Sequence, residues 1–268
     1  MLDRSDQPGN SSPNAGLRGR RAVLATHHWL TFLLPFLVYM LVGSFEPTPD
    51  KLGGQDLGLA IPYAYYPAIY VAKIGLTIAA MLLVWPGYRQ FAPRITLLGI
   101  AVGVVGVVVW VGLCRLDLEH RLLLPLLKPV GLGGLIAAGT RSAFDPFQQF
   151  AGRPVEAWGF LAVRFVGLAA VVPVIEEFFL RGFVMRLVVT QQWWKLPIGR
   201  VNTAAILLGT LVPMTMHPGE LLAAAVWFSM VTWLMVKTQS LWDCVAAHAI
   251  TNLLLGIYVV TTGDWRLM

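Results

Sequence analysis

The chain has 268 residues, of which 57% are hydrophobic and 13% are charged, and its mean hydropathy is +0.68. A soluble domain carries about twice this share of charged residues, so the composition excludes an ordinary soluble protein and predicts an integral membrane protein. The net charge of +6 does not indicate a nucleic-acid partner. Basic residues also flank membrane spans on the cytoplasmic side, and no basic run is interleaved with aromatic residues.

The first 21 residues are polar, rich in Gly, Pro and Ser, and basic at their end. This composition predicts a disordered basic cytoplasmic tail over residues 1–21. The apolar run that follows is long and has no small-residue cleavage pattern after it, so we expect a retained anchor rather than a signal peptide.

Apolar runs of about 18 residues or more predict transmembrane helices. Another stretch, 203–236, is interrupted by "MHPGE" and predicts two helices broken near His217 and Pro218. Residues 122–139 contain two prolines and four glycines, which favours a re-entrant or interfacial segment over an eighth helix. The expected fold is therefore an all-α, polytopic transmembrane bundle of seven to eight helices. The uninterrupted runs lie at 28–45, 64–86, 95–114, 157–189 and 240–260.

The Lys and Arg residues between the spans predict the orientation of the chain. Arg18, Arg20 and Arg21 precede the first span, so the N-terminus is expected in the cytoplasm of a multi-pass protein of the cell (inner) membrane. Later basic residues fit the same orientation, whereas residues 115–156 have mixed charge and give no clear indication. The basic residues that agree are Arg89, Arg94, Arg186, Lys195 and Arg200. We describe residues 22–156 as N-terminal helices with a mixed-charge loop, and 261–268 as a short C-terminal tail.

Two glutamates and an arginine occur in "EEFFLR", within one of the most apolar runs. Ionisable residues inside spans are rare and usually functional. Glu177 and Arg181 are four residues apart, so they share a helix face and can form an ion pair. Glu176 is rotated by about 100° from that face and is left to act in the bundle interior, where a carboxylate can serve as a general base and then as an acid. The alternative is a polar network that only fixes helix packing.

Two later motifs carry polar residues in apolar runs. His248 and Asn252 in "HAITN" lie on one helix face and can both donate hydrogen bonds, as an oxyanion requires, or can bond between helices. His217 in "MTMHPGE" is predicted near a helix end, whereas Glu176 and His248 are predicted near mid-helix. Either the helix boundaries differ from those expected, or the site lies nearer the cytoplasmic face.

Other polar residues suggest simpler roles. Lys73 and Arg164 are expected to extend toward a membrane interface. Cys114 and Cys244 are expected to be buried thiols, because neither belongs to a CxxC motif.

The three motifs, taken in order, resemble one family. EExxxR in a membrane helix, a lone histidine later, and HxxxN in the last span are similar to the CAAX prenyl protease and bacteriocin-processing family (CPBP or Abi), and in particular to its type II CAAX endopeptidases. The resemblance covers residues 157–256 and is carried by Glu176-Glu177-Phe178-Phe179-Leu180-Arg181, by His217, and by His248-Ala249-Ile250-Thr251-Asn252.

The resemblance implies an intramembrane protease with its catalytic core over residues 157–260. It implies that Glu176 is the base and His217 its partner in activating water. His248 and Asn252 would form the oxyanion hole, with Glu177 and Arg181 supporting the site. The family commonly has Phe four residues before the second-motif histidine, where this chain has Pro213, and this departure bears on the helix path around His217.

The resemblance also bears on cofactors and partners. Glu and His side chains are zinc ligands as well, but no HExxH is present and we expect no metal cofactor. The expected partners are membrane lipid and a protein or peptide substrate, either membrane-associated or processed at its C-terminus. By analogy with some relatives, a protein-sorting system is a further candidate partner. Two other functions stay open: a non-catalytic immunity or partner-stabilising protein, and a transporter that uses the same residues as a proton path.

Overall fold

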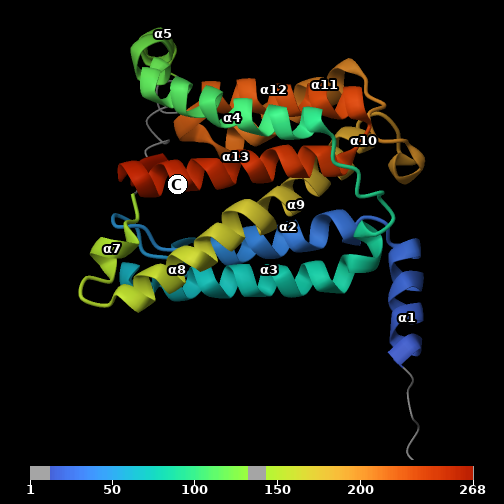
Figure 1. Cartoon of the computed structure of the whole chain (residues 1–268), viewed down its shortest axis with the longest axis horizontal. Coiled ribbons are helices and arrows are strands. Elements are labelled where there is room, and N and C mark those ends of the chain that lie inside the picture. Colours follow the sequence, from blue (N-terminus) through green and yellow to red (C-terminus); the bar gives the residue numbers. More distant parts are fainter. Residues whose placement is uncertain (1–12, 132–142, 268) are drawn as a thin grey trace, which may run out of the picture.

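The structure is a computed structural model that describes residues 13–131 and 143–267. The described residues are almost wholly helical and form no β-strand beyond two isolated bridges in the loop after the second helix. Most long helices run side by side, and α1 lies across one end of the bundle (Figure 1). The helices are α1 (Pro13–Thr26), α2 (Leu30–Gly43), α3 (Tyr66–Tyr88), α4 (Leu97–Leu116), α5 (Leu124–Leu127), α7 (Pro146–Gln149), α8 (Pro154–Val166), α9 (Val172–Glu177), α10 (Met185–Leu187), α11 (Thr203–Met216), α12 (Leu221–Thr238) and α13 (Leu241–Thr262).

The architecture confirms the expected all-α membrane bundle, although the number of spans is lower than seven to eight. Five described segments are long and apolar enough to cross a membrane, or six if the bent pair Gly19–Thr26 and Leu30–Gly43 counts as one. The difference arises because α2 and α11 have 14 residues each. Such helices are about 21 Å long, which is shorter than a hydrocarbon layer of about 30 Å. The five spans are Tyr63–Tyr88, Leu97–Leu116, Pro154–Leu187, Pro218–Thr238 and Leu241–Thr262.

The N-terminal end of the chain differs from the sequence expectation. Helix α1 begins at Pro13, within the segment predicted to be a disordered tail; residues 1–12 lie outside the described part. At the other end, Trp265 is 7% exposed and packs into the core, so the C-terminal tail is folded against the bundle.

The region predicted as a re-entrant segment or an eighth helix is described only in part. Its first half forms three short turns, namely the π-helical η3 (Glu119–Leu123), α5 and the 3-10 turn η4 (Lys128–Val130). Buried Glu119 accepts a hydrogen bond from the backbone N–H of Leu222 at 3.0 Å, which satisfies one of the unpaired donors at the start of α12. Residues 132–142, which hold the rest of the predicted segment, lie outside the described residues.

Helices α4 and α13 pack closely because α4 presents glycines to α13. A Cβ at Gly103 would lie 2.8 Å from the carbonyl oxygen of Ala247, and one at Gly106 would lie 2.7 Å from Thr251 Oγ1. Small residues allow helix backbones to approach in this way inside membranes. At this distance the Thr251 hydroxyl donates a hydrogen bond to the carbonyl of Gly103 at 2.8 Å.

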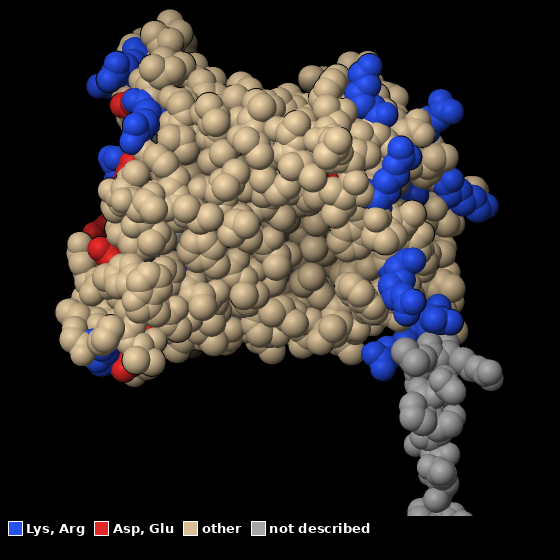
Figure 2. All heavy atoms as spheres, viewed as in Figure 1, with Lys and Arg blue, Asp and Glu red and all other residues tan. Residues whose placement is uncertain are grey.

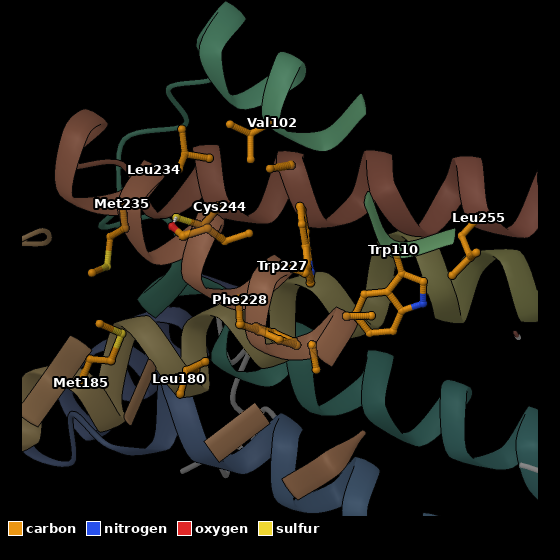
Figure 3. Packing of buried hydrophobic residues seen from close by; sticks show 14 of the residues in the cluster. Val102, Trp110, Leu180, Met185, Trp227, Phe228, Leu234, Met235, Cys244 and Leu255 are labelled. Carbon is orange, nitrogen blue, oxygen red and sulfur yellow. Dashed lines mark hydrogen bonds between the residues drawn. The ribbon is translucent and has the colours of Figure 1, made fainter. Parts of the chain in front are cut away.

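Helix α12 supplies the centre of the largest hydrophobic cluster. Trp227 and Phe228 are each 1% exposed, and Figure 3 shows both among side chains from the neighbouring helices, with Trp110 of α4 nearby. Because α12 is surrounded in this way, its first turns hold a fixed position relative to α4 and α13.

The glycine packing predicts a stability difference between two substitutions on α4. Gly106→Val places a branched side chain against Thr251 and the Trp227 ring, and such overpacking typically costs about 1–3 kcal/mol. The purified protein should therefore show a lower apparent Tm in detergent. Gly112→Val on the same helix is the control, because nothing lies within 4 Å of its added Cβ. Equal Tm values for the two variants would refute the role assigned to the α4–α13 contact.

Candidate active site

One continuous helical span, Pro154–Leu187, carries the first motif and is not a regular α-helix. It contains two π-helical segments, η5 (Gly167–Val171) and η6 (Phe178–Val184), on either side of α9. Such segments widen a helix locally and are frequent at functional sites. Glu176 and Glu177 therefore stand at the end of a short α-helical stretch between two widened turns.

The two adjacent glutamates face different surroundings, as the helical spacing predicts. Glu177 is 0% exposed and forms an ion pair with Arg181, with 2.5 Å between Oε2 and Nη1. Glu176 is only half-buried and lines a cavity. One carboxylate thus lies inside the protein packing, and the other lies on an internal surface.

The ion pair is part of a longer buried chain of hydrogen bonds. His248 Nδ1 lies 2.9 Å from Oε1 of Glu177, and Arg181 Nη2 donates to the carbonyl oxygen of Phe228 at 3.1 Å. Together these bonds join the helix of the first motif to both α12 and α13. The sequence predicted the Glu177–Arg181 pair but not the contact with His248, which links the first motif to the third.

The cavity beside Glu176 has a volume of about 760 Å³ and brings the three motifs together. Glu176, His217, His248 and Asn252 all line it. These four residues come from α9, the end of α11 and the middle of α13, three segments that are far apart in the sequence. The polar residues that the sequence singled out for chemistry are therefore neighbours in space.

His217 is the C-cap of the short helix α11. Counted along the helices from the end where α1 lies, His217 is about 21 Å deep, Glu176 about 16 Å and His248 about 10 Å, at 1.5 Å per residue. A residue at a helix end thus reaches the depth of mid-helix residues because α11 stops early. The predicted helix boundaries are close to those in the structure. His217 lies near the depth of Glu176 because α11 is shorter than the membrane is thick.

The ring of His217 is held by its own helix and by two aromatic side chains. Nδ1 lies 2.8 Å from the carbonyl oxygen of Pro213. Because a carbonyl only accepts, Nδ1 must carry the proton, and Nε2 carries the lone pair of the neutral ring. The rings of Trp110 and Phe228 each lie 5.5 Å from the imidazole, between centroids. Position 213 therefore orients the histidine through its backbone carbonyl, which does not depend on the side chain at that position.

Asn252 is oriented by a defect in the facing helix. Its Nδ2 donates to the carbonyl oxygen of Leu168 at 2.9 Å. In a π-type turn that carbonyl would accept from the N–H of residue 173, but residue 173 is proline and has none. The amide has two N–H groups, so one completes the backbone of η5 and a second is left for another acceptor.

The sequence analysis underestimated Lys73, which also lines the cavity. Its side chain is 5% exposed and pairs with Glu46 at 2.8 Å, and its Nζ lies 4.4 Å from the centre of the Tyr39 ring. Lys73 therefore does not extend to a membrane interface. Glu46 lies in the loop after α2, and only the tertiary fold brings it close, so the sequence gave no sign of this pair.

Arg164 was likewise expected at an interface, and the structure again differs. Its side chain is buried and donates from Nη1 to the carbonyl oxygen of Phe144 at 3.1 Å.

The two cysteines were expected to be buried thiols, and the structure is closer to this expectation. Neither forms a disulfide bond in the described structure, and Cys244 is buried whereas Cys114 is half-buried.

The donor set was also considered for a metal ion. Among residues 13–131 and 143–267, no group of three or more His, Cys, Asp or Glu side chains is arranged to hold one.

Comparisons with known proteins agree with the geometry. No curated protein and no solved structure matches the chain. The family model described as "Type II CAAX prenyl endopeptidase Rce1-like" matches residues 158–254, a range that contains all three motifs and every residue named above for the chemistry. The chain therefore carries an Rce1-like domain of the type II CAAX prenyl endopeptidase family over residues 158–254.

Proposed function

We propose that this protein is an intramembrane endopeptidase that hydrolyses a peptide bond of a membrane-associated or C-terminally processed protein. The observation that carries the proposal is the shared cavity, into which three separate motifs bring a carboxylate, two imidazoles and an amide. Hydrolysis of an amide needs a base for water and donors for the developing oxyanion, and this set contains both.

Glu176 is the general base in this proposal. It is half-buried on the cavity wall, whereas Glu177 is held by Arg181 and His248. Glu176 takes a proton from water, the hydroxide attacks the carbonyl carbon of the peptide bond, and Glu176 then returns the proton to the departing amine nitrogen. His217 orients the water through Nε2, because its Nδ1 is turned to the carbonyl of Pro213.

His248 and Asn252 stabilise the tetrahedral intermediate. Both line the cavity, and each has one side-chain group fixed by the protein: His248 by Glu177 and Asn252 by Leu168. An imidazolium carries an N–H on both ring nitrogens, and an amide nitrogen carries two N–H groups, so each side chain can offer a second donor. Donors held in place before the reaction need no reorganisation as charge develops on the oxygen.

The buried ion pair of Glu177 and Arg181 supports the site without taking part in the chemistry. Glu177 and Arg181 lie behind the cavity wall and are each 0% exposed. Such a network would also fix the packing of a non-catalytic relative. What favours an enzyme is the position of Glu176 on the wall of the cavity, beside His217, His248 and Asn252. The proposed partners are membrane lipid and the protein substrate.

Replacing the base is expected to remove activity and leave the fold intact. Glu176→Gln keeps the shape of the side chain but cannot take a proton, and loss of a general base typically lowers rates by about 10²–10⁴-fold. Protein termini in the membrane and secreted proteomes of cells with the wild-type chain should include cleavage products that are missing with Glu176→Gln. Glu156→Gln is the matched control, since Glu156 is exposed and pairs only with Arg153 in the described structure. Unchanged products with Glu176→Gln at normal protein levels would refute the mechanism.

Removing the cation of the buried pair should instead destabilise the protein. Arg181→Ala leaves the Glu177 carboxylate buried without its main counter-charge, and such a loss costs about 3–5 kcal/mol. We expect a clearly lower apparent Tm in detergent, together with lost activity, whereas Glu176→Gln keeps its Tm. Arg153→Ala is the control, because this arginine belongs to an exposed pair that contributes about 0–1 kcal/mol. A normal Tm for Arg181→Ala would contradict the supporting role.

Metal chelation is expected to leave the activity unchanged. The proposed chemistry assigns water activation to Glu176 and His217, and the described residues contain no three-ligand group for a metal. The purified enzyme should cleave a peptide taken from an identified product at the same rate with and without 1,10-phenanthroline. Inhibition that zinc reverses, and that a non-chelating phenanthroline isomer does not produce, would show that a metal takes part.

A further inference from the structure

The two ends of the bundle differ in the charges of their connecting segments. We call the end at which α1 lies the α1 end and the other the opposite end. At the α1 end, the basic residues have no exposed acidic neighbours in the described chain. Its one described acid is Asp243, which is 0% exposed and accepts hydrogen bonds from Thr96. The basic residues there are Arg20, Arg21, Arg89, Arg94, Arg186, Lys195, Arg200 and Lys237.

The opposite end carries both signs of charge. On the face shown in Figure 2, Lys and Arg stand alone along the edge at the α1 end, whereas acidic and basic side chains are mixed along the opposite edge. Several of these form local pairs, namely Lys51–Asp56, Arg153–Glu156 and Arg266–Asp264. The described basic residues are also fewer at this end: Lys51, Arg115, Arg121, Lys128, Arg153 and Arg266.

This asymmetry gives the bundle a direction in the membrane. Cytoplasmic segments carry the excess of Lys and Arg, so the α1 end is cytoplasmic and the opposite end is not. All four segments at the α1 end agree: the stretch before α2, and the turns that join α3 to α4, α10 to α11, and α12 to α13. The sequence analysis assigned the first three of these segments to one side, and the fold places all four at one end of the bundle (Figure 1).

The active-site cavity extends toward the opposite end. Beyond Glu176 and His248, its lining includes Ser44 and Glu46 after α2, Thr215 near the end of α11, and Leu267 after α13. Each of these segments lies where its helix ends away from α1. Ser44 and Thr215 are exposed, so the cavity reaches the protein surface between the ends of α2 and α11.

The short helices explain why the cavity is open on this side. Both α2 and α11 start at the α1 end, and with 14 residues each they are about 21 Å long. In a layer of about 30 Å they stop before the opposite face. Toward the α1 end the same helices continue, and the buried side chains of the network and of Phe178 fill the interior.

We propose that the cavity admits its substrate from the non-cytoplasmic side of the membrane, so that the substrate class is a membrane-attached protein whose cleavage site enters the cavity from that side. That a substrate enters the cavity rests on the proposed function. The side of the membrane to which the cavity opens rests on the fold and the charges alone. The residues at the mouth, Ser44 and Thr215, are then accessible from outside the cytoplasm.

Cysteine labelling tests the direction without needing activity. Ser44→Cys and Thr215→Cys report on the cavity mouth, and Gln90→Cys, at an exposed position in the turn after α3, reports on the α1 end. Each is made with Cys114→Ser, while fully buried Cys244 stays as an internal position. A membrane-impermeant maleimide is applied to intact spheroplasts and to inverted membrane vesicles of expressing cells. Normal elution in size-exclusion chromatography shows which variants are folded. Two positions at the cavity mouth are used so that the test remains possible if one variant fails to fold.

The expected result is labelling of Ser44→Cys and Thr215→Cys in spheroplasts, with loss of that labelling in inverted vesicles, and the reverse for Gln90→Cys. Labelling of the mouth positions only in inverted vesicles, or of all three positions from one side, would overturn the proposal. Product termini that depend on Glu176 should map to non-cytoplasmic segments, and termini in cytoplasmic segments would also overturn it. If labelling follows the expected pattern but no termini depend on Glu176, the proposed function fails and the direction of the cavity stands.

Discussion

The buried ion pair between Glu177 and Arg181 is the constraint on which the site depends. Removing two charges from water is costly, and the cost is offset only when the geometry is good and the remaining polar atoms are bonded. Here Glu177 also bonds His248, and Arg181 also bonds the carbonyl of Phe228. These bonds fix the first-motif helix against α12 and α13. With one glutamate committed to this network, helical geometry turns its neighbour Glu176 toward the cavity.

Helix length shapes the site as much as side-chain chemistry does. Because α11 stops early, its C-cap residue His217 lies among residues from the middle of longer helices. The early ends of α2 and α11 also leave the space that becomes the cavity. A helix end inside the membrane depth is tolerated only where the backbone faces protein or a water-filled cavity. The cavity therefore depends on the short helices for its space, and the ends of the short helices depend on the cavity for polar surroundings.

Much of this could be predicted from local sequence patterns, and the rest depended on contacts between distant segments. Hydropathy predicted the membrane bundle, and the four-residue spacing predicted the pair between Glu177 and Arg181, because both act within one helix. The pairing of Lys73 with Glu46 and the bond from Glu119 to the start of α12 join separate segments, and no local pattern indicates them. The site residues were found through motif order, whereas their common cavity needed the fold.

Backbone defects explain why two of the site residues are so well oriented. An unpaired carbonyl inside a membrane costs several kcal/mol, so each break in a helix must be completed by another donor. Pro173 leaves the carbonyl of Leu168 without a backbone partner in its π-type turn, and Asn252 supplies the donor. At the end of α11 the carbonyl of Pro213 is completed by the ring of His217. The same bond that repairs the backbone fixes one side of each polar group and directs its other side elsewhere. The orientation of these groups thus follows from the need to satisfy the broken helices, and it exists before any substrate binds.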